Sequence, residues 1–147
     1  MQFEGDREVP IPAAVGWQKL SDARFLVQCI PNVESVSQVQ ADRAVCTIRP
    51  GLAFARGSLE LTVQVVEAVP ESSVRLLLHT KGIGSSSDVE ATLKLVPQEA
   101  ATQIHWVAEV QRLGGLLKAV PQGLIKAAAQ KVIADVLTAV ENKLTSG

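Results

Sequence analysis

The sequence predicts an α+β domain in which a curved antiparallel sheet of about seven strands surrounds a long C-terminal helix. Apolar and polar residues alternate through the middle of the chain, and clusters of turn residues separate the alternating runs. A long segment without helix breakers then closes the chain. Alternation with a period of two is typical of antiparallel strands that bury one face. Because strands and helices are segregated along the chain, the pattern indicates an α+β domain.

The chain is expected to begin with a strand over residues 2–9 and two short helices. The first helix is predicted over residues 12–20, because Pro12 suits the first turn of a helix. The second is predicted over residues 23–29, where Ser21 and Asp22 offer N-terminal caps and Pro31 ends the segment.

The remaining strands are predicted from the alternating runs. The clearest are residues 59–65 and 89–95, in which leucine, valine or alanine takes every second position. The turns between runs contain proline, glycine, serine or aspartate, which favour reversal of the chain. The runs lie at residues 44–48, 59–65, 74–78, 89–95 and 104–110.

The C-terminal helix is predicted from Pro121 to about Lys143, and its apolar stripe has an unusual spacing. Apolar residues recur every four positions, at Leu124, Ala128, Val132, Val136, Val140 and Leu144. Each step of four rotates the stripe by about 40°. If the helix is straight, its first half is expected to fill the core and its last turns to face another surface. A helix that curves over a twisted sheet is the alternative.

The composition is that of a folded globular protein and argues against a nucleic-acid-binding role. The chain has 147 residues, which fits a single domain spanning residues 1–147. Hydrophobic residues make up 47% of it, and the formal net charge is −1. Aromatic residues make up 3% and tyrosine is absent, so few side chains could stack on bases.

The sequence is also expected to belong to a soluble, cytoplasmic protein. Cys29 and Cys46 are too few for a disulfide framework and are expected to be reduced thiols. Residues 1–12 are charged and lack the apolar core of a signal peptide. No apolar run approaches the roughly 18 residues of a membrane span.

Residues that could carry catalysis or bind a metal are sparse. His79 and His105 fall on the polar phase of their strands and are expected to face solvent. A metal site needs three or four converging ligands, and the sequence offers no such set. Cys29 follows an apolar run and is expected to be a buried, inert thiol. No catalytic residue, metal or cofactor is therefore predicted.

Several segments together resemble a known family. The start of the chain resembles START-like (SRPBCC, helix-grip) domains, in Phe3-Glu4-Gly5, Val9-Pro10-Ile11-Pro12 and Val15-Gly16-Trp17. Residues 29–35, Cys-Ile-Pro-Asn-Val-Glu-Ser, more narrowly resemble the CoxG-like family of carbon monoxide dehydrogenase proteins, which usually has glycine where Asn32 stands. Later segments follow in the family's order, at Arg56-Gly57-Ser58-Leu59, Gly82 to Ser85 and Leu113-Gly114-Gly115-Leu116.

The resemblance implies a helix-grip fold and a binding module with a hydrophobic pocket. Members of the family are associated with molybdenum hydroxylases such as carbon monoxide dehydrogenase, and are thought to carry a quinone or to connect the enzyme to the membrane. The resemblance therefore implies a quinone- or lipid-like ligand and a molybdenum hydroxylase as partner. Some members carry a C-terminal tail, and because this sequence stops at Gly147, tail-dependent membrane contact is not expected.

The resemblance also turns apolar residues that core packing would explain equally well into candidates for the pocket lining. Phe54 lies on an apolar stretch that is a candidate lid. Arg7 and Arg56 could donate hydrogen bonds to a ligand carbonyl; the alternative is that both reach solvent. The apolar candidates are Phe25, Ile30, Phe54, Leu59, Leu61, Leu76, Leu78, Ile104, Trp106, Leu117, Leu124 and Ala128.

Two other functions remain open on sequence grounds, and self-association into a homodimer is also left open. A cyclase-like enzyme acting on an aromatic or lipid substrate would use the same pocket. A protein-interaction module without a ligand would use the last turns of the C-terminal helix, at Val140 and Leu144.

Overall fold

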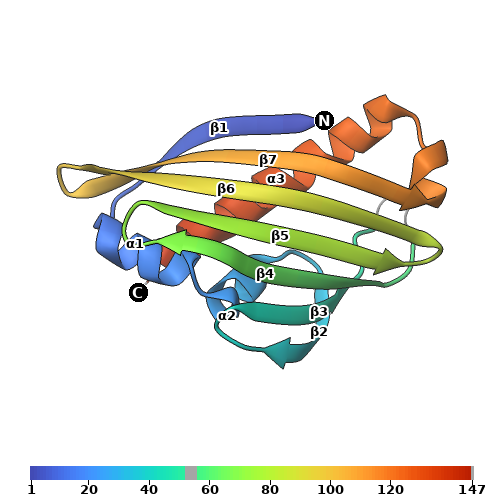
Figure 1. The fold of residues 1–147 in the computed structure, drawn as a ribbon, viewed down its shortest axis with the longest axis horizontal. Helices are drawn as coiled ribbons and strands as arrows, with labels where there is room; N and C mark the ends of the chain where they lie inside the picture. Colours follow the sequence, from blue (N-terminus) through green and yellow to red (C-terminus); the bar gives the residue numbers. More distant parts are fainter. Residues whose placement is uncertain (52–55, 147) are drawn as a thin grey trace.

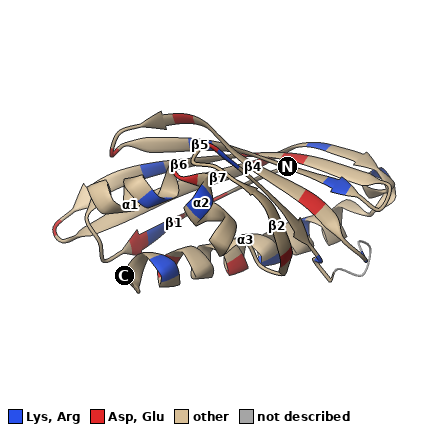
Figure 2. Ribbon diagram, turned by 90° about the horizontal axis from the view of Figure 1, so that it is seen from below, with Lys and Arg blue, Asp and Glu red and all other residues tan. Residues whose placement is uncertain are grey.

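The computed structural model describes residues 1–51 and 56–146, which form one sheet with helices packed against a single face (Figures 1 and 2). In chain order the elements are β1 (Gln2–Val9), α1 (Ala13–Leu20), α2 (Ala23–Leu26), the 3-10 turn η1 (Val27–Cys29), β2 (Val33–Val39), β3 (Arg43–Ile48), β4 (Leu59–Val69), β5 (Ser73–Gly82), β6 (Ser85–Gln98), β7 (Ala101–Gly115), the 3-10 turn η2 (Leu116–Ala119) and α3 (Gln122–Thr145).

The sheet has seven strands in the order β1-β7-β6-β5-β4-β3-β2, and every neighbouring pair is antiparallel. Sequential strands are therefore neighbours except β1, which pairs with β7 at the far end of the chain. α3 crosses behind the sheet in Figure 1, from the end that carries η2 to the end that carries α1. The predicted fold class, a curved antiparallel sheet around a C-terminal helix, is confirmed.

No alternating run predicted β2, and its surroundings explain why. β2 is an edge strand whose residues are exposed apart from the partly buried Val33. Its register with β3 shifts twice, between Val33 and Ser35 and between Val36 and Gln38. A strand that buries neither face and contains bulges has no strict period of two.

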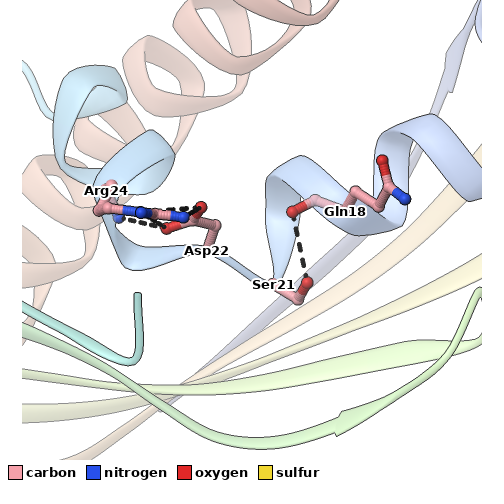
Figure 3. A network of polar contacts seen from close by, with 4 residues as sticks. All are labelled: Gln18, Ser21, Asp22 and Arg24. Carbon is pink, nitrogen blue, oxygen red and sulfur yellow. Dashed lines mark hydrogen bonds and ion pairs between the residues drawn. The ribbon is translucent and has the colours of Figure 1, made fainter. Parts of the chain in front are cut away.

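The link between α1 and α2 is fixed by local polar contacts (Figure 3). The Asp22 carboxylate accepts a hydrogen bond from the backbone N–H of Arg24 at 2.9 Å, which caps α2. The Arg24 side chain returns to the same carboxylate, with Nη2 2.7 Å from Oδ2. This side-chain hydrogen bond is the main cause that lowers the pKa of Asp22 below its usual value. The predicted cap before the second helix is therefore present.

Replacing Asp22 by Ala should lower the free energy of unfolding by about 1 kcal/mol, because the cap of α2 is lost. Asn can still cap a helix, so Asp22→Asn should lose less at neutral pH. Because folding lowers the pKa of Asp22, its charge stabilises the fold above about pH 4 and stops doing so as the pH falls further. Urea denaturation at pH 7 and pH 3 measures both effects. Equal losses in the two variants at pH 7 would contradict the capping role.

The two faces of the sheet differ as the alternation predicts. The concave face, which α3 covers, includes the buried side chains of Val9, Val63 and Val74. The short helices join this core through Leu20 and Leu26. Two hydrogen bonds tie them to the sheet: Trp17 Nε1 donates to the Ser73 carbonyl at 3.1 Å, and Thr102 Oγ1 donates to the Ile11 carbonyl at 2.7 Å.

The expectation for the stripe of α3 is wrong, because the two halves of the helix have opposite environments. Val140 and Leu144 are 8% and 3% exposed and belong to the core, whereas Leu124 is 53% exposed. The C-terminal half of α3 is buried because η1 and β1 pack against the helix. Val140 and Leu144 are therefore not available as an interaction surface. None of the described helices is long and apolar enough to cross a membrane.

Candidate ligand-binding site

The core is closed at the end of the sheet near α1 and less completely closed toward the start of α3. Leu78, Leu93 and Trp106 point from the sheet toward α3, yet all three are only partly buried. Ala128, Ala129 and Ile133 of α3 are likewise only partly buried. Apolar side chains between the sheet and the first half of α3 therefore retain surface that a hydrophobic ligand could cover.

A cavity of about 400 Å³ opens between β1 and α3 at this place. Its apolar lining comes from Phe3 on β1, Trp106 on β7, and Ile133, Ala134 and Leu137 on α3. Its polar lining comes from Gln2, Glu4, Arg7, Lys126 and Gln130. An apolar floor with a few polar groups is the usual composition of a small-molecule site.

Gly5 makes room for the Trp106 side chain in this cavity. The two residues are cross-strand partners on β1 and β7. A Cβ atom added to Gly5 would lie 2.8 Å from Trp106 Cζ2 and 3.0 Å from Cε2. Any larger residue at this position must therefore displace the ring. The Phe3-Glu4-Gly5 segment noted in the sequence thus shapes the wall of the cavity.

Arg7 joins the sheet to the helix at the edge of the cavity. Its side chain points to the concave side from β1, and its Nη1 donates to Glu141 Oε2 on α3 at 2.9 Å. Both side chains are partly exposed, at 32% and 41%. A ligand carbonyl near Arg7 would therefore share the guanidinium with Glu141. Arg56, the other candidate donor, is exposed.

The structure places the other sequence candidates in three environments. Leu61, Leu76 and Ile104 are buried in the core. The candidates that are half-buried at the edges of that core are Phe25, Ile30, Leu59, Leu78, Leu117 and Ala128. Leu124 is exposed, and Phe54 lies outside the described residues. Of the candidates, the cavity between β1 and α3 brings together only Trp106 and Arg7.

The cavity residues that sequence reasoning missed lie mostly on α3. Lys126, Gln130, Ile133 and Leu137 follow one another at spacings of four, three and four residues, which keeps them on one face of a helix. The stripe of residues spaced strictly by four drew attention to a different face. A search for mixed spacings of three and four would have found Ile133 and Leu137.

Both histidines lie on the convex face of the sheet, each beside a carboxylate on a neighbouring strand. His79 Nδ1 lies 2.5 Å from Asp88 Oδ1, and His105 Nδ1 lies 2.9 Å from Asp6 Oδ1. His79 and Asp88 also line a depression of about 350 Å³ on that face. Within residues 1–51 and 56–146, no group of three or more histidine, cysteine or acidic side chains could hold a metal ion.

Both cysteines are buried, and burial raises the pKa of each thiol. For Cys29 burial is the main cause and raises the pKa to about 11, although the charge of Lys143 opposes it. Burial also raises the pKa of Cys46. Neither thiol is therefore activated as a nucleophile at neutral pH.

We expect both thiols to resist alkylation in the folded protein. At pH 8 only about a thousandth of Cys29 is thiolate, and both side chains are out of contact with solvent. Iodoacetamide should add to neither residue within the time that it modifies both in concentrated urea. Intact mass measures the number of adducts. Rapid addition to the native protein would show that the core around η1 opens frequently.

Comparison with known proteins gives a family match and several similar folds. The family model of the carbon monoxide dehydrogenase protein CoxG matches residues 5–145. No curated protein matches the sequence closely enough to count as a relative.

Solved structures with similar folds are distant in sequence. A conserved protein from Geobacillus kaustophilus has a TM-score of 0.85 and 21% identity, covering 99% of this chain and 96% of its own. A START superfamily protein from Mycobacterium smegmatis has a TM-score of 0.71 and 13% identity, covering 99% and 97%. Norcoclaurine synthase from Thalictrum flavum has a TM-score of 0.66 and 15% identity, covering 100% and 94%. At these identities the likeness shows the fold alone.

Proposed function

The chain belongs to the CoxG family of carbon monoxide dehydrogenase proteins, and from this premise we propose that it is an accessory protein that binds a hydrophobic ligand between the sheet and α3. The observation that supports this most directly is the cavity between β1 and α3, where apolar side chains stay partly exposed beside polar ones. Its volume of about 400 Å³ suits the ring and first few carbons of a larger amphiphile.

A quinone- or lipid-like molecule fits the chemistry of the lining. An apolar ring or chain would contact Trp106, Ile133 and Leu137. A carbonyl oxygen at the opening could accept hydrogen bonds from Arg7, Lys126 or Gln130, which all carry N–H donors. The cavity thus offers one apolar region and one donor region, as an isoprenoid quinone would require.

Tryptophan fluorescence tests the binding site directly, because the chain has only two tryptophans. Trp106 lines the cavity, whereas Trp17 is on α1 and donates to Ser73. A water-soluble quinone analogue should quench the fluorescence of a Trp17→Phe variant, in which only Trp106 emits, with saturation. A Trp106→Phe variant is the matched control and should show only collisional quenching. Equal, non-saturating quenching in both variants would contradict the proposed site.

The natural ligand class can be established from the protein as purified from cells. Native mass spectrometry should show a bound species of defined mass, and organic extraction should release a quinone or an acyl lipid. A protein that carries nothing and does not take up quinone analogues would contradict the ligand-carrier proposal.

We further propose that the protein works in the cytoplasm and serves a molybdenum hydroxylase of the carbon monoxide dehydrogenase type. The family match supports this partner, since the family model bears that enzyme's name. The test is co-elution of the tagged protein with a molybdenum hydroxylase from its native cells. Recovery with no such enzyme, when the protein is cross-linked before lysis, would contradict the partnership. No feature of the cavity favours cyclase chemistry as a second function.

A further inference from the structure

The turn between β5 and β6 carries an isoleucine in a backbone conformation that disfavours it. Ile83 and Gly84 connect the paired residues Gly82 and Ser85, and their φ angles are +54° and +68°. Two successive positive φ angles define the hairpin turn that Asn-Gly adopts most readily. A β-branched residue with positive φ is an outlier, yet Ile83 is also 41% exposed. Strain of this kind persists mainly where the residue has a function.

A second exposed aliphatic residue lies beside this turn. Leu116 is 64% exposed, and its backbone N–H donates to the Gly84 carbonyl at 3.0 Å. A Cβ on Gly84 would lie 3.5 Å from Leu116 Cδ1, and a Cβ on Gly57 would lie 3.7 Å from Ile83 Cδ1. Ile83 and Leu116 therefore form one exposed surface, here named the apolar tip. It lies at the right-hand end of Figure 1, away from the C-terminus.

The chain segments around the apolar tip are basic, although the protein as a whole has a net charge of −1. Residues 110–134 contain four basic residues and no acidic one, and residues 43–59 contain three basic residues and no acidic one. The exposed Lys118 follows Leu116 in η2, and the exposed Arg56 precedes Gly57. Two aliphatic side chains are thus flanked by two cations.

We propose that the apolar tip, with Arg56 and Lys118 around it, docks on an anionic lipid surface. Aliphatic side chains can enter the acyl region while lysine and arginine remain with the lipid phosphates. The anchors of protein interfaces are instead enriched in tryptophan, tyrosine and arginine, and leucine is under-represented there. Ile83 and Leu116 are both aliphatic, which favours lipid over a protein partner. This inference goes beyond the proposed function and does not depend on which ligand the cavity holds.

The test measures co-sedimentation of the full chain with ligand-free vesicles. Vesicles of phosphatidylcholine with a quarter phosphatidylglycerol should bind the protein, and those of pure phosphatidylcholine should bind it several-fold less. Lys118→Gln should weaken binding to the anionic vesicles about fivefold, since a single cation near such a surface contributes about that much. Binding should also fall as salt is raised.

Ile83→Asn separates a lipid-docking role from a structural one. Asparagine adopts positive φ more readily than isoleucine, so the variant should unfold at the same temperature as the wild type or higher. Its binding to anionic vesicles should nevertheless fall on the order of tenfold, because an apolar anchor is lost. Val96→Asn is the matched control: Val96 is 48% exposed near the other end of β6, and its loss should leave binding unchanged.

Two results would overturn the inference: no binding of the wild type to anionic vesicles at low salt, or wild-type binding by Ile83→Asn. Retention of vesicle binding by Ile83→Asn together with loss of a purified protein partner would assign the tip to that protein instead. Because the vesicles contain no quinone, failure of the ligand proposal would leave all of these results unaffected.

Discussion

Replacing Leu144 by Ala should lower the free energy of unfolding by about 3 kcal/mol, whereas the same change at Leu124 should alter it by no more than about 0.5 kcal/mol. Both residues lie on α3, at its opposite ends, and both belong to the stripe of residues four apart. Leu144 is 3% exposed and packed in the core, so its truncation leaves a cavity. Leu124 is 53% exposed and has little contact area to lose.

Thermal and urea unfolding of the two variants measure this difference. In a domain of this size, 3 kcal/mol corresponds to a fall in Tm of roughly 6–12 °C. The pair is well matched because the substitution, the helix and the removed atoms are the same. A larger loss for Leu124→Ala than for Leu144→Ala would mean that the first half of α3, and not the last turns, closes the core.

Replacing Gly5 by Ala should weaken binding of a quinone analogue at least about tenfold, because the added methyl group displaces the Trp106 ring. The ring forms part of the cavity wall, so its movement changes the surface that the ligand meets. Stability should also fall, by about 2 kcal/mol, as is usual when a methyl group is forced into a packed site. Fluorescence of the Trp17→Phe background reports the altered environment of Trp106.

Gly123→Ala is the matched control for this prediction. A Cβ at Gly123 meets no atom within 4 Å, and the residue lies in the first turn of α3. Alanine there should stabilise the protein by roughly 0.5 kcal/mol and leave ligand binding unchanged. Unaltered binding by Gly5→Ala, with unaltered Trp106 fluorescence, would contradict the role of Gly5 in shaping the cavity.

The fold could be predicted because most strands have one buried and one solvated face. On β4, for example, Leu61 and Val63 are buried while Glu60 and Gln64 are exposed, and this alternation is visible in the sequence. β2 could not be found in the same way, because almost all of its side chains are exposed. The direction in which α3 buries its stripe depends on packing by η1 and β1, which no local pattern contains.

The candidate site was less predictable, because a cavity wall and a core use the same types of residue. Leu61, Leu76 and Ile104 satisfy every sequence criterion for a pocket residue and are nevertheless core residues. Trp106 and Arg7 line the cavity, but so does Phe3, which only its position beside Gly5 could have suggested. The distinction depends on how far α3 lies from each strand, which is a property of the assembled fold.

The pairing of β1 with β7 has a consequence for how the protein folds. β1 is made first, but its one neighbour in the sheet is the last strand of the chain. The Arg7–Glu141 pair likewise joins residues 134 positions apart. Such distant contacts slow folding, because the chain must lose much entropy before they form. During synthesis, β1 must therefore remain unpaired until β7 has left the ribosome, and the cavity is completed only in the final step of folding.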